Sequence, residues 1–293
     1  MRDVILALDM GGTSIKRALV DAAGAPLQAA VCPFAAETRE ALLQTFCDVV
    51  AAGRDAAGQM GCRITHVGIA CPGPFDFRGG ISQMTHKWAA IQGVPLPPIL
   101  GEILPGIPVS FMHDSTAFML GEAYGGAARG ARNPAGVMLG TGFGYTYMLD
   151  RRVCLDAALS PRIRLWREPW QAGIVEDYVS RRAIRKRYGE ETGKADDVPD
   201  VREIADRADA GEPEALATFR ETGALLGGIL KQHLEKGCDL VVVGGQIAYA
   251  AALLLPAASQ MLRVPIVPAA HIADAALRGI GCFCTRKDVT CTP

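Results

Sequence analysis

Three glycine-rich turns, each placed directly after a short apolar run, constrain the fold of this chain more than any other feature. They are Gly11-Gly12, Gly140-Thr141-Gly142 and Gly244-Gly245. Glycine lacks a Cβ and reaches positive φ, so successive backbone N–H groups can point into one concavity that an anion can approach. One such turn is typical of an ordinary hairpin. Three turns at strand ends, two of them with a threonine (Thr13 and Thr141), predict a nucleotide phosphate site.

Two common nucleotide motifs are absent from the sequence. There is no G-x-x-x-x-G-K-[ST] loop, and the run Gly140-x-Gly142-x-Gly144 leads into a strand rather than opening a helix. These absences count against the P-loop and Rossmann classes.

Along the whole chain, apolar runs of the length of a β-strand alternate with segments whose apolar residues recur with the period of an α-helix. Val4–Leu8, Ser14–Asp21 and Leu27–Val31 read as an antiparallel meander, and the order strand, glycine turn, strand returns from Gly136. We therefore expect a two-lobed α/β protein with a mixed sheet in each lobe, residues 1–113 plus about 272–293 forming one lobe and 114–271 the other. The main predicted helices are Thr38–Gly58, Ser115–Tyr124, Ile174–Arg187, Glu214–Lys236, Gln246–Leu255 and Ile272–Cys282.

Composition excludes several classes of partner. The chain has 293 residues, 49% of them hydrophobic, and a net charge of −1, which gives no general attraction to nucleic acid or to an anionic membrane. The first apolar run is too short for a signal peptide, and no run reaches membrane-spanning length, so we expect a cytoplasmic protein. The nine cysteines are scattered and are interpreted as reduced thiols.

Two charged residues flank the first glycine turn. Asp9 could hold Mg²⁺, through water, beside the nucleotide phosphates, or it could cap the turn with its own side chain. Lys16 lies on the outgoing strand, where alternation could point it back towards the phosphates; a solvated lysine is the alternative. Both residues are candidates for nucleotide binding together with Gly11, Gly12 and Thr13.

The segment Leu8–Lys16 resembles the first phosphate motif of the ROK family, which contains sugar kinases, N-acetylhexosamine kinases and related repressors within the actin/hexokinase/Hsp70 superfamily. The likeness covers nearly the whole chain and implies the actin-like, ribonuclease H-like fold, ATP with Mg²⁺, a small sugar as partner, and a homodimer. Further stretches resemble the sugar-side loop, the catalytic strand end, the second phosphate motif, the adenosine motif and the closing helix of the family: Gly68–Pro74, His113–Ala117 with Gly121–Ala123, Leu139–Gly144, Val241–Gly245 and Ala275–Gly281.

The resemblance gives Asp114 the role of general base. A sugar hydroxyl is a poor nucleophile, and a carboxylate within hydrogen-bond reach can take its proton as the phosphoryl group arrives. Asp114 follows a buried strand and precedes a helix, so it could instead serve as a helix N-cap. Both roles are compatible. The resemblance also implies that Gly73, Pro74, His113 and Glu176 contact the sugar, although Glu176 could equally be an exposed carboxylate near a helix start.

This chain departs from the family pattern on its sugar side. His113 stands where relatives have asparagine, and His86 lies in the segment where relatives have another asparagine. Many members also carry a histidine and a CxCGxxGCxE cluster that binds zinc. Between Arg151 and Glu176 this chain has only Cys154 and no histidine, so we predict no zinc site.

An arginine- and tryptophan-rich segment, residues 160–170, occupies the place of the zinc loop. Arg162, Arg164 and Arg167 could bind an anionic sugar, with Trp166 or Trp170 stacking on its ring. The alternative is a solvated loop at a dimer contact, where Arg and Trp are enriched.

The sequence therefore favours an ATP-dependent sugar kinase and leaves two other functions open. One is a sugar-sensing regulator; repressors of the family carry an N-terminal DNA-binding domain, for which the first strand at Val4 leaves no room. The other is a degenerate kinase kept as a partner protein, which the presence of Asp9 and Asp114 argues against.

Overall fold

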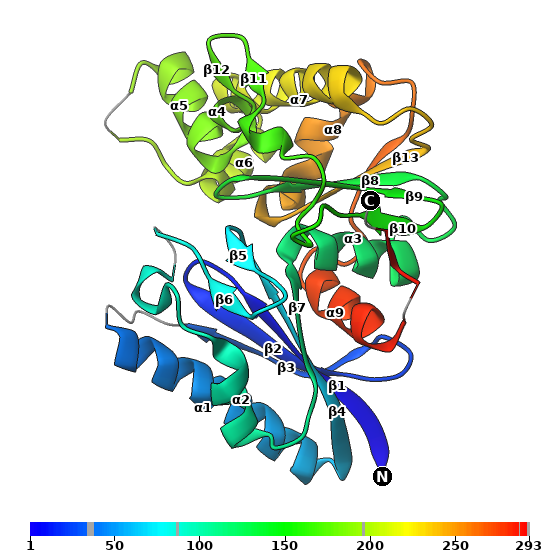
Figure 1. Cartoon of the computed structure of the whole chain (residues 1–293). Coiled ribbons are helices and arrows are strands. Elements are labelled where there is room, and N and C mark those ends of the chain that lie inside the picture. Colours follow the sequence, from blue (N-terminus) through cyan, green and yellow to red (C-terminus); the bar gives the residue numbers. More distant parts are fainter. Residues whose placement is uncertain (34–37, 86–87, 195–196, 287, 292–293) are drawn as a thin grey trace. The chain divides into compact units, whose positions relative to one another are not determined.

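The computed structural model describes residues 1–33, 38–85, 88–194, 197–286 and 288–291. It divides the chain into two compact units, which are coloured along the sequence in Figure 1. Unit 1 comprises Met1–Gly125, Arg152–Arg162 and Asp274–Pro293, and unit 2 comprises Gly126–Arg151 and Ile163–Ala273. Each unit contains a mixed sheet with flanking helices, so the predicted α/β class is confirmed.

The sheet of unit 1 has five strands in the order β3-β2-β1-β4-β7. β1 pairs antiparallel with β2 and parallel with β4, and β4 pairs parallel with β7. The carboxyl ends of β1, β4 and β7 therefore lie at one edge of the sheet. The strands are β1 Arg2–Met10, β2 Ser14–Val20, β3 Pro26–Pro33, β4 Cys62–Cys71 and β7 Val109–His113.

Helices cover both faces of this sheet. Val4, Leu6 and Leu8 share a buried core with the apolar side of α1 (Arg39–Gln59), whose Thr38 side chain accepts the N–H of Ala41 as a cap. α2 (Leu96–Ile103) joins the same core. The alternate residues of β1 pack on the other face with α9, as period-two alternation requires. That face is covered by α3 (Asp114–Gly125) and α9 (Ala275–Thr285). Smaller elements of unit 1 are β5 Phe75–Asp76, β6 Ile81–Ser82, β10 Arg152–Cys154 and β15 Thr290–Cys291.

Arg17 is an unexpected member of the α1-facing layer. It alternates with the fully buried Ile15 and Leu19, is only 9% exposed, and its Nε and Nη1 have no hydrogen-bond partner among the described residues. A Cβ built on Gly53 of α1 would lie 3.2 Å from the Arg17 Cδ, so the side chain runs directly beneath the helix.

Replacing Arg17 with methionine is expected to stabilise the protein. Methionine keeps most of the buried stem and removes polar atoms that lose water without gaining a partner, so the free energy of unfolding should rise by about 1–3 kcal/mol. Urea unfolding followed by circular dichroism measures the change. Arg17→Ala is the control and should be less stable than Arg17→Met, because it also removes the packed stem. A lower unfolding free energy for Arg17→Met than for wild type would contradict the interpretation.

The sheet of unit 2 contains the strand order β14-β13-β8-β9. β13 pairs parallel with β8 and with β14, while β8 pairs antiparallel with β9. The strands are β8 Pro134–Leu139, β9 Phe143–Leu149, β13 Leu240–Gly244 and β14 Ile266–Pro268. The helices and the short hairpin are α4 Glu176–Val179, α5 Arg181–Thr192, α6 Val201–Asp209, α7 Pro213–His233, α8 Ala251–Ser259, the 3₁₀ turns η2 Leu165–Arg167 and η3 Gln246–Ala250, and the strands β11 Pro169–Trp170 and β12 Gly173–Ile174.

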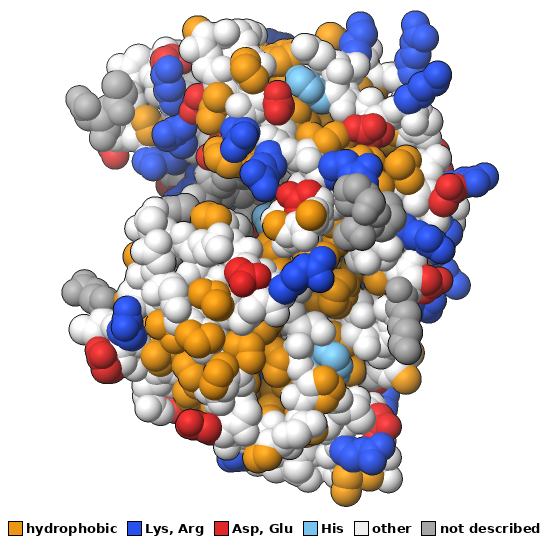
Figure 2. Space-filling view, viewed as in Figure 1, with side chains coloured by type: hydrophobic (Ala, Val, Ile, Leu, Met, Phe, Trp, Pro, Cys, Tyr) orange, Lys and Arg blue, Asp and Glu red, His pale blue; other side chains and the backbone are white. Residues whose placement is uncertain are grey.

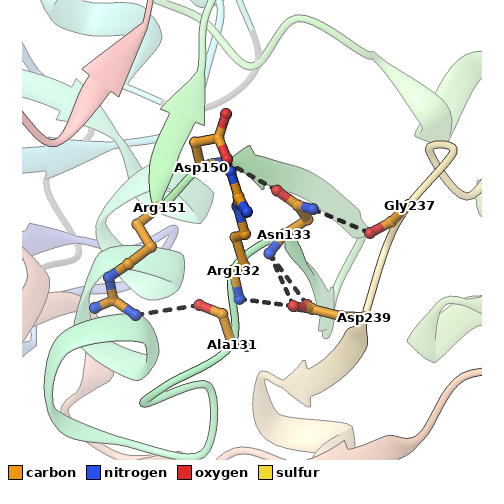
Figure 3. A network of polar contacts seen from close by, with 7 residues as sticks. All are labelled: Ala131, Arg132, Asn133, Asp150, Arg151, Gly237 and Asp239. Atoms are coloured by element: carbon orange, nitrogen blue, oxygen red, sulfur yellow. Dashed lines mark hydrogen bonds and ion pairs between the residues drawn. The ribbon is translucent and has the colours of Figure 1, made fainter.

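A polar network fixes the neighbouring starts of β8 and β13 (Figure 3). The Asp239 carboxylate accepts the backbone N–H groups of Arg132 at 2.6 Å and Asn133 at 3.1 Å. The Asn133 side chain donates to the Gly237 carbonyl and accepts from the Asp150 N–H, which lies just beyond β9. These hydrogen bonds therefore join β8, β9 and β13 at the ends of the strands that lie opposite the two glycine turns of unit 2.

The structure differs from the predicted elements at two places in unit 2. The single helix predicted for Ile174–Arg187 is two helices, α4 and α5, because Ser180 adopts an extended backbone and its side chain accepts the Ala183 N–H as an N-cap. The predicted helix Gln246–Leu255 begins as the 3₁₀ turn η3 before α8.

The compact units also divide the chain differently from the predicted lobes. The predicted boundary after residue 113 precedes α3, whereas unit 1 extends to Gly125 and includes residues 152–162. α3 lies in unit 1 because glycines on α3 and α9 bring the two helices into backbone contact.

The surface of the two units differs in character. On the face shown in Figure 2, Lys and Arg side chains are numerous over α4, α5 and α7 of unit 2, and apolar side chains gather over α1 and α2 of unit 1. Across the described residues, the structure has no helix that combines the length and the apolar character needed to span a bilayer.

Candidate functional site

Polar residues of unit 1 gather at the carboxyl ends of its parallel strands. Asp9 is the penultimate residue of β1, and Asp114 follows directly after β7. β4 lies between them and leads into Gly73-Pro74, whose peptide bond is cis. In open α/β sheets the crevice outside the carboxyl ends of strands is where ligands bind. The five predicted positions Asp9, Gly73, Pro74, His113 and Asp114 therefore lie at one edge of one sheet.

The first glycine turn is a tight connection between β1 and β2. The Gly11 N–H donates to the Ser14 carbonyl at 2.9 Å, and Gly12 and Thr13 are exposed at its tip. Trp88 reaches the turn from far along the chain, since its indole Nε1 donates to the Gly11 carbonyl at 3.0 Å. No local sequence signal predicts this contact, because it joins residues 77 positions apart. Lys16 stands directly opposite Asp9 in the β1–β2 register.

The Asp9 carboxyl has a perturbed pKa. Burial raises its pKa to about 6; the Lys16 ammonium opposes this rise, and the Asp114 carboxylate adds to it. The Asp114 carboxylate contributes to this rise although β4 lies between the two strands, so the two carboxyl groups are close enough to interact electrostatically. A perturbed carboxyl at a strand end marks a candidate functional group.

Without nucleotide and Mg²⁺, Asp9 should make the stability of the protein depend on pH. The folded-state pKa near 6 exceeds the unfolded value near 4, so the folded state binds more protons between these values and stability falls as pH rises through them. We expect Asp9→Asn to raise the free energy of unfolding by about 2–3 kcal/mol at pH 8 and by little at pH 4. Urea unfolding of both proteins in chelator-treated buffer at the two pH values tests this. An Asp9→Asn variant less stable than wild type at pH 8 would contradict it.

His113 contacts the predicted base directly. Its Nδ1 lies 2.8 Å from Asp114 Oδ1 and 2.9 Å from Ser115 Oγ. The Ser115 N–H donates to Asp114 Oδ1 at 2.6 Å and to His113 Nδ1 at 3.2 Å. Asp114 is itself the first residue of α3, so it does not occupy the N-cap position that the sequence offered as an alternative role. The other edge of the imidazole approaches the sugar-side loop, because a Cβ built on Gly73 would lie 3.6 Å from His113 Nε2. The histidine is thus placed between Asp114 and the loop containing Gly73 and Pro74.

The second and third glycine turns lie side by side in unit 2. β8 ends at Leu139 before Gly140, and the parallel register pairs Gly244 of β13 with Met138. Gly245 has φ +83°, and a Cβ built on it would lie 2.3 Å from the Leu139 carbonyl oxygen. Only glycine fits at this position, for conformation and for space. The predicted nucleotide positions Gly140, Thr141, Gly142, Gly244 and Gly245 therefore form one edge of the unit 2 sheet.

Glu176 lies against the second glycine turn. It is the first residue of α4, and its Oε2 accepts the Phe143 N–H at 2.9 Å. The expectation of a sugar contact is neither supported nor opposed by this hydrogen bond. No local sequence signal predicts this contact, because it joins residues 33 positions apart.

The remaining sequence candidates are the segment 160–170 and His86. The side chains of Arg162, Trp166 and Arg167 are exposed, and the division between the units falls within their segment. His86 lies outside the described residues. Within the described ranges, the structure groups no three His, Cys, Asp or Glu side chains in a way that could hold a metal ion by themselves.

The similarity of the chain to known proteins agrees with this arrangement. The ROK family matches residues 5–155, slightly more than half of the chain. The chain belongs to the ROK family. The glucokinase of Thermotoga maritima is 26% identical over 272 residues, covering 85% of this chain and 84% of that protein. The DNA-binding transcriptional repressor Mlc of Escherichia coli is 33% identical over 88 residues, which are 30% of this chain and 21% of the repressor.

Solved structures extend the similarity over nearly the whole chain. The ROK family glucokinase of Streptomyces griseus, in complex with glucose and AMPPNP, superposes with a TM-score of 0.78 at 21% identity, covering 96% of this chain and 98% of that one. The predicted actin-like ATPase fold is therefore confirmed.

Proposed function

We propose that this protein is an ATP-dependent sugar kinase that phosphorylates a hydroxyl of a hexose or of an amino or modified sugar. The observation that carries the proposal is the placement of Asp9 and Asp114 at the carboxyl ends of β1 and β7, where the two carboxylates affect each other. The Thermotoga maritima relative is a glucokinase, and the Streptomyces griseus protein binds glucose and AMPPNP, which supports the same reaction class.

Asp114 has the role of general base in this proposal. A carboxylate at a strand end can accept the proton of the sugar hydroxyl while the hydroxyl oxygen attacks the γ-phosphorus and the bond to the β-phosphate oxygen breaks. Its hydrogen bond from the Ser115 N–H fixes the orientation of the carboxylate. ATP gives up its γ-phosphoryl group, and the products are a sugar phosphate and ADP.

The donor side uses the glycine turns. Gly11, Gly12 and Thr13 of unit 1 offer backbone N–H groups and a hydroxyl to the phosphates, with Lys16 as the nearby cation. In unit 2 the same role falls to Gly140, Thr141 and Gly142, and Gly244-Gly245 borders the adenosine.

Mg²⁺ fits the residues at the end of β1. Asp9 is a hard oxygen donor, and the costly burial of its charge beside Asp114 would be relieved by a cation. Magnesium typically takes one or two carboxylates and completes its shell with water and phosphate oxygens, so Asp9 would hold it through water. The ion supplies charge neutralisation at the β- and γ-phosphates.

The acceptor side carries the residues that distinguish this chain. We assign sugar contacts to Gly73, Pro74, His113 and Glu176. The imidazole at position 113 can donate or accept one hydrogen bond per nitrogen, where the asparagine of relatives offers an amide. We therefore expect the preferred sugar to differ from that of a relative with asparagine.

A sugar-binding regulator is the second candidate, favoured by the similarity of an 88-residue segment to the repressor Mlc. The charge distribution argues against direct DNA binding by the basic helix α5. Arg181 pairs with Asp200 and Arg187 with Glu221, while Arg185 donates to the Val198 and Pro199 carbonyls. These cations are committed within unit 2, so they offer little to phosphates of a nucleic acid.

A coupled assay of ADP release across a panel of hexoses and amino sugars tests the proposal. The expected result is turnover that requires Mg²⁺ and one class of sugar. Nucleotide binding without turnover on any sugar would favour the regulator or a degenerate kinase. We also propose that the protein is a cytoplasmic homodimer. Size-exclusion chromatography with light scattering tests the oligomeric state.

A further inference from the structure

The turn between β8 and β9 is held from outside the sheet by the α4–α5 segment. Glu176 Oε2 accepts the Phe143 N–H at 2.9 Å at one end of the turn. At the other end, the Arg181 N–H donates to the Gly140 carbonyl at 2.9 Å. Within the turn, the Gly140 N–H donates to the Gly142 carbonyl at 3.0 Å. Glu176 and Arg181, five positions apart on one segment, therefore form hydrogen bonds with the two ends of the four-residue turn Gly140–Phe143.

The Glu176 carboxylate also fills the space beside Gly142. A Cβ built on Gly142 would lie 2.5 Å from Glu176 Oε2 and 3.3 Å from its Cδ. In contrast, a Cβ built on Gly140 meets nothing within 4 Å. The space beside Gly142 is thus filled by the carboxylate, whereas the space beside Gly140 is open. An anion would be repelled by the negative charge of Glu176 beside Gly142 and not by a neighbour of Gly140.

We propose that Glu176 is a positioning residue for the phosphoryl donor: it fixes the conformation of the Gly140–Phe143 turn that binds the nucleotide phosphates. The inference rests on the proposed function, and it adds a role to the sugar contact assigned to Glu176. A turn held in its binding conformation loses less conformational entropy when ligand binds, so removing the hold weakens nucleotide binding even with no sugar present.

The decisive measurement is the affinity for Mg²⁺–ATP in the absence of sugar, by isothermal titration calorimetry. Glu176→Ala should weaken binding about tenfold, because the Phe143 N–H loses its acceptor and the turn is no longer held in its binding conformation. Glu176→Gln should bind within about twofold of wild type or more tightly, because the amide oxygen still accepts and the negative charge is gone. The matched control is Asp177→Asn, the next carboxylate on α4, which accepts the Ile174 N–H and should leave the affinity unchanged.

A substitution in the turn itself tests the same role of Glu176 without changing residue 176. Gly142→Ala places a methyl group where the carboxylate lies, and the flexible Glu176 side chain can move away. The variant should therefore fold and lose the Phe143 hydrogen bond. Its ATP affinity should fall by about the same factor as that of Glu176→Ala, and the double variant should be no weaker than Glu176→Ala alone.

The outcomes distinguish failure of the proposed function from failure of the positioning role of Glu176. If wild type binds no Mg²⁺–ATP, the proposed function fails. If wild type binds and Glu176→Ala binds equally well, with only the sugar KM raised, then Glu176 serves the sugar alone and the positioning role is overturned.

Discussion

Asp114→Asn is expected to lower kcat for sugar phosphorylation by about a thousandfold while leaving the fold intact. The amide is nearly isosteric with the carboxylate, and its oxygen can still accept the Ser115 N–H that Asp114 Oδ1 accepts at 2.6 Å. This hydrogen bond within the first turn of α3 is therefore preserved. What the amide cannot do is take a proton from the sugar hydroxyl, so the loss should appear in kcat rather than in the affinity for ATP.

The measurement combines steady-state kinetics on the preferred sugar with ATP binding and circular dichroism. Asp76→Asn serves as the control, since Asp76 is a carboxylate of the same unit that accepts the local N–H groups of Arg78 and Gly79. A kcat within tenfold of wild type for Asp114→Asn would remove Asp114 as the base. A variant that lost ATP binding together with turnover would indicate a structural role instead.

The edges of the two sheets could be predicted from the sequence because glycine and aspartate at strand ends have local causes. Gly11-Gly12 connects two apolar strands of opposite direction, and Thr38 marks the start of α1 by its ability to cap. Each signal lies within a few residues of the element it specifies. The positions of Asp9 and Asp114 at one edge then follow from parallel strands, whose carboxyl ends meet on the same side.

The contacts that complete these edges could not be predicted, because they depend on residues far apart in the sequence. Trp88 donates to Gly11, 77 positions away in the sequence, and Glu176 accepts from Phe143, 33 positions away. The burial of Arg17 could not be predicted from the sequence either, for a different reason. Period-two alternation places it in the core, and its charge argues against burial, so the local rules conflict there.

The largest effect on stability is expected at Gly279 in α9. A Cβ built there would lie 1.7 Å from the Ala117 carbonyl oxygen and 2.8 Å from the Gly121 backbone nitrogen, both on α3. Gly121 makes the reciprocal approach, since a Cβ built on it would lie 2.0 Å from the Ala275 carbonyl oxygen. Both obstacles are backbone atoms, which cannot rotate aside as a side chain can. Gly279→Ala must therefore push the two helices apart.

Separating the helices would also loosen Leu277 and Ile280, which are buried against the sheet face that α9 covers. We expect Gly279→Ala to lower the free energy of unfolding by about 4 kcal/mol or more, measured as the shift of the urea midpoint. Gly58→Ala is the matched control, because a Cβ on this α1 glycine meets nothing within 4 Å and alanine has the higher helix propensity. The control should be as stable as wild type or slightly more so. If both substitutions had equally small effects, close backbone contact would not explain why α3 lies with α9 in unit 1, and the helix pair would have to be held by its apolar side chains alone.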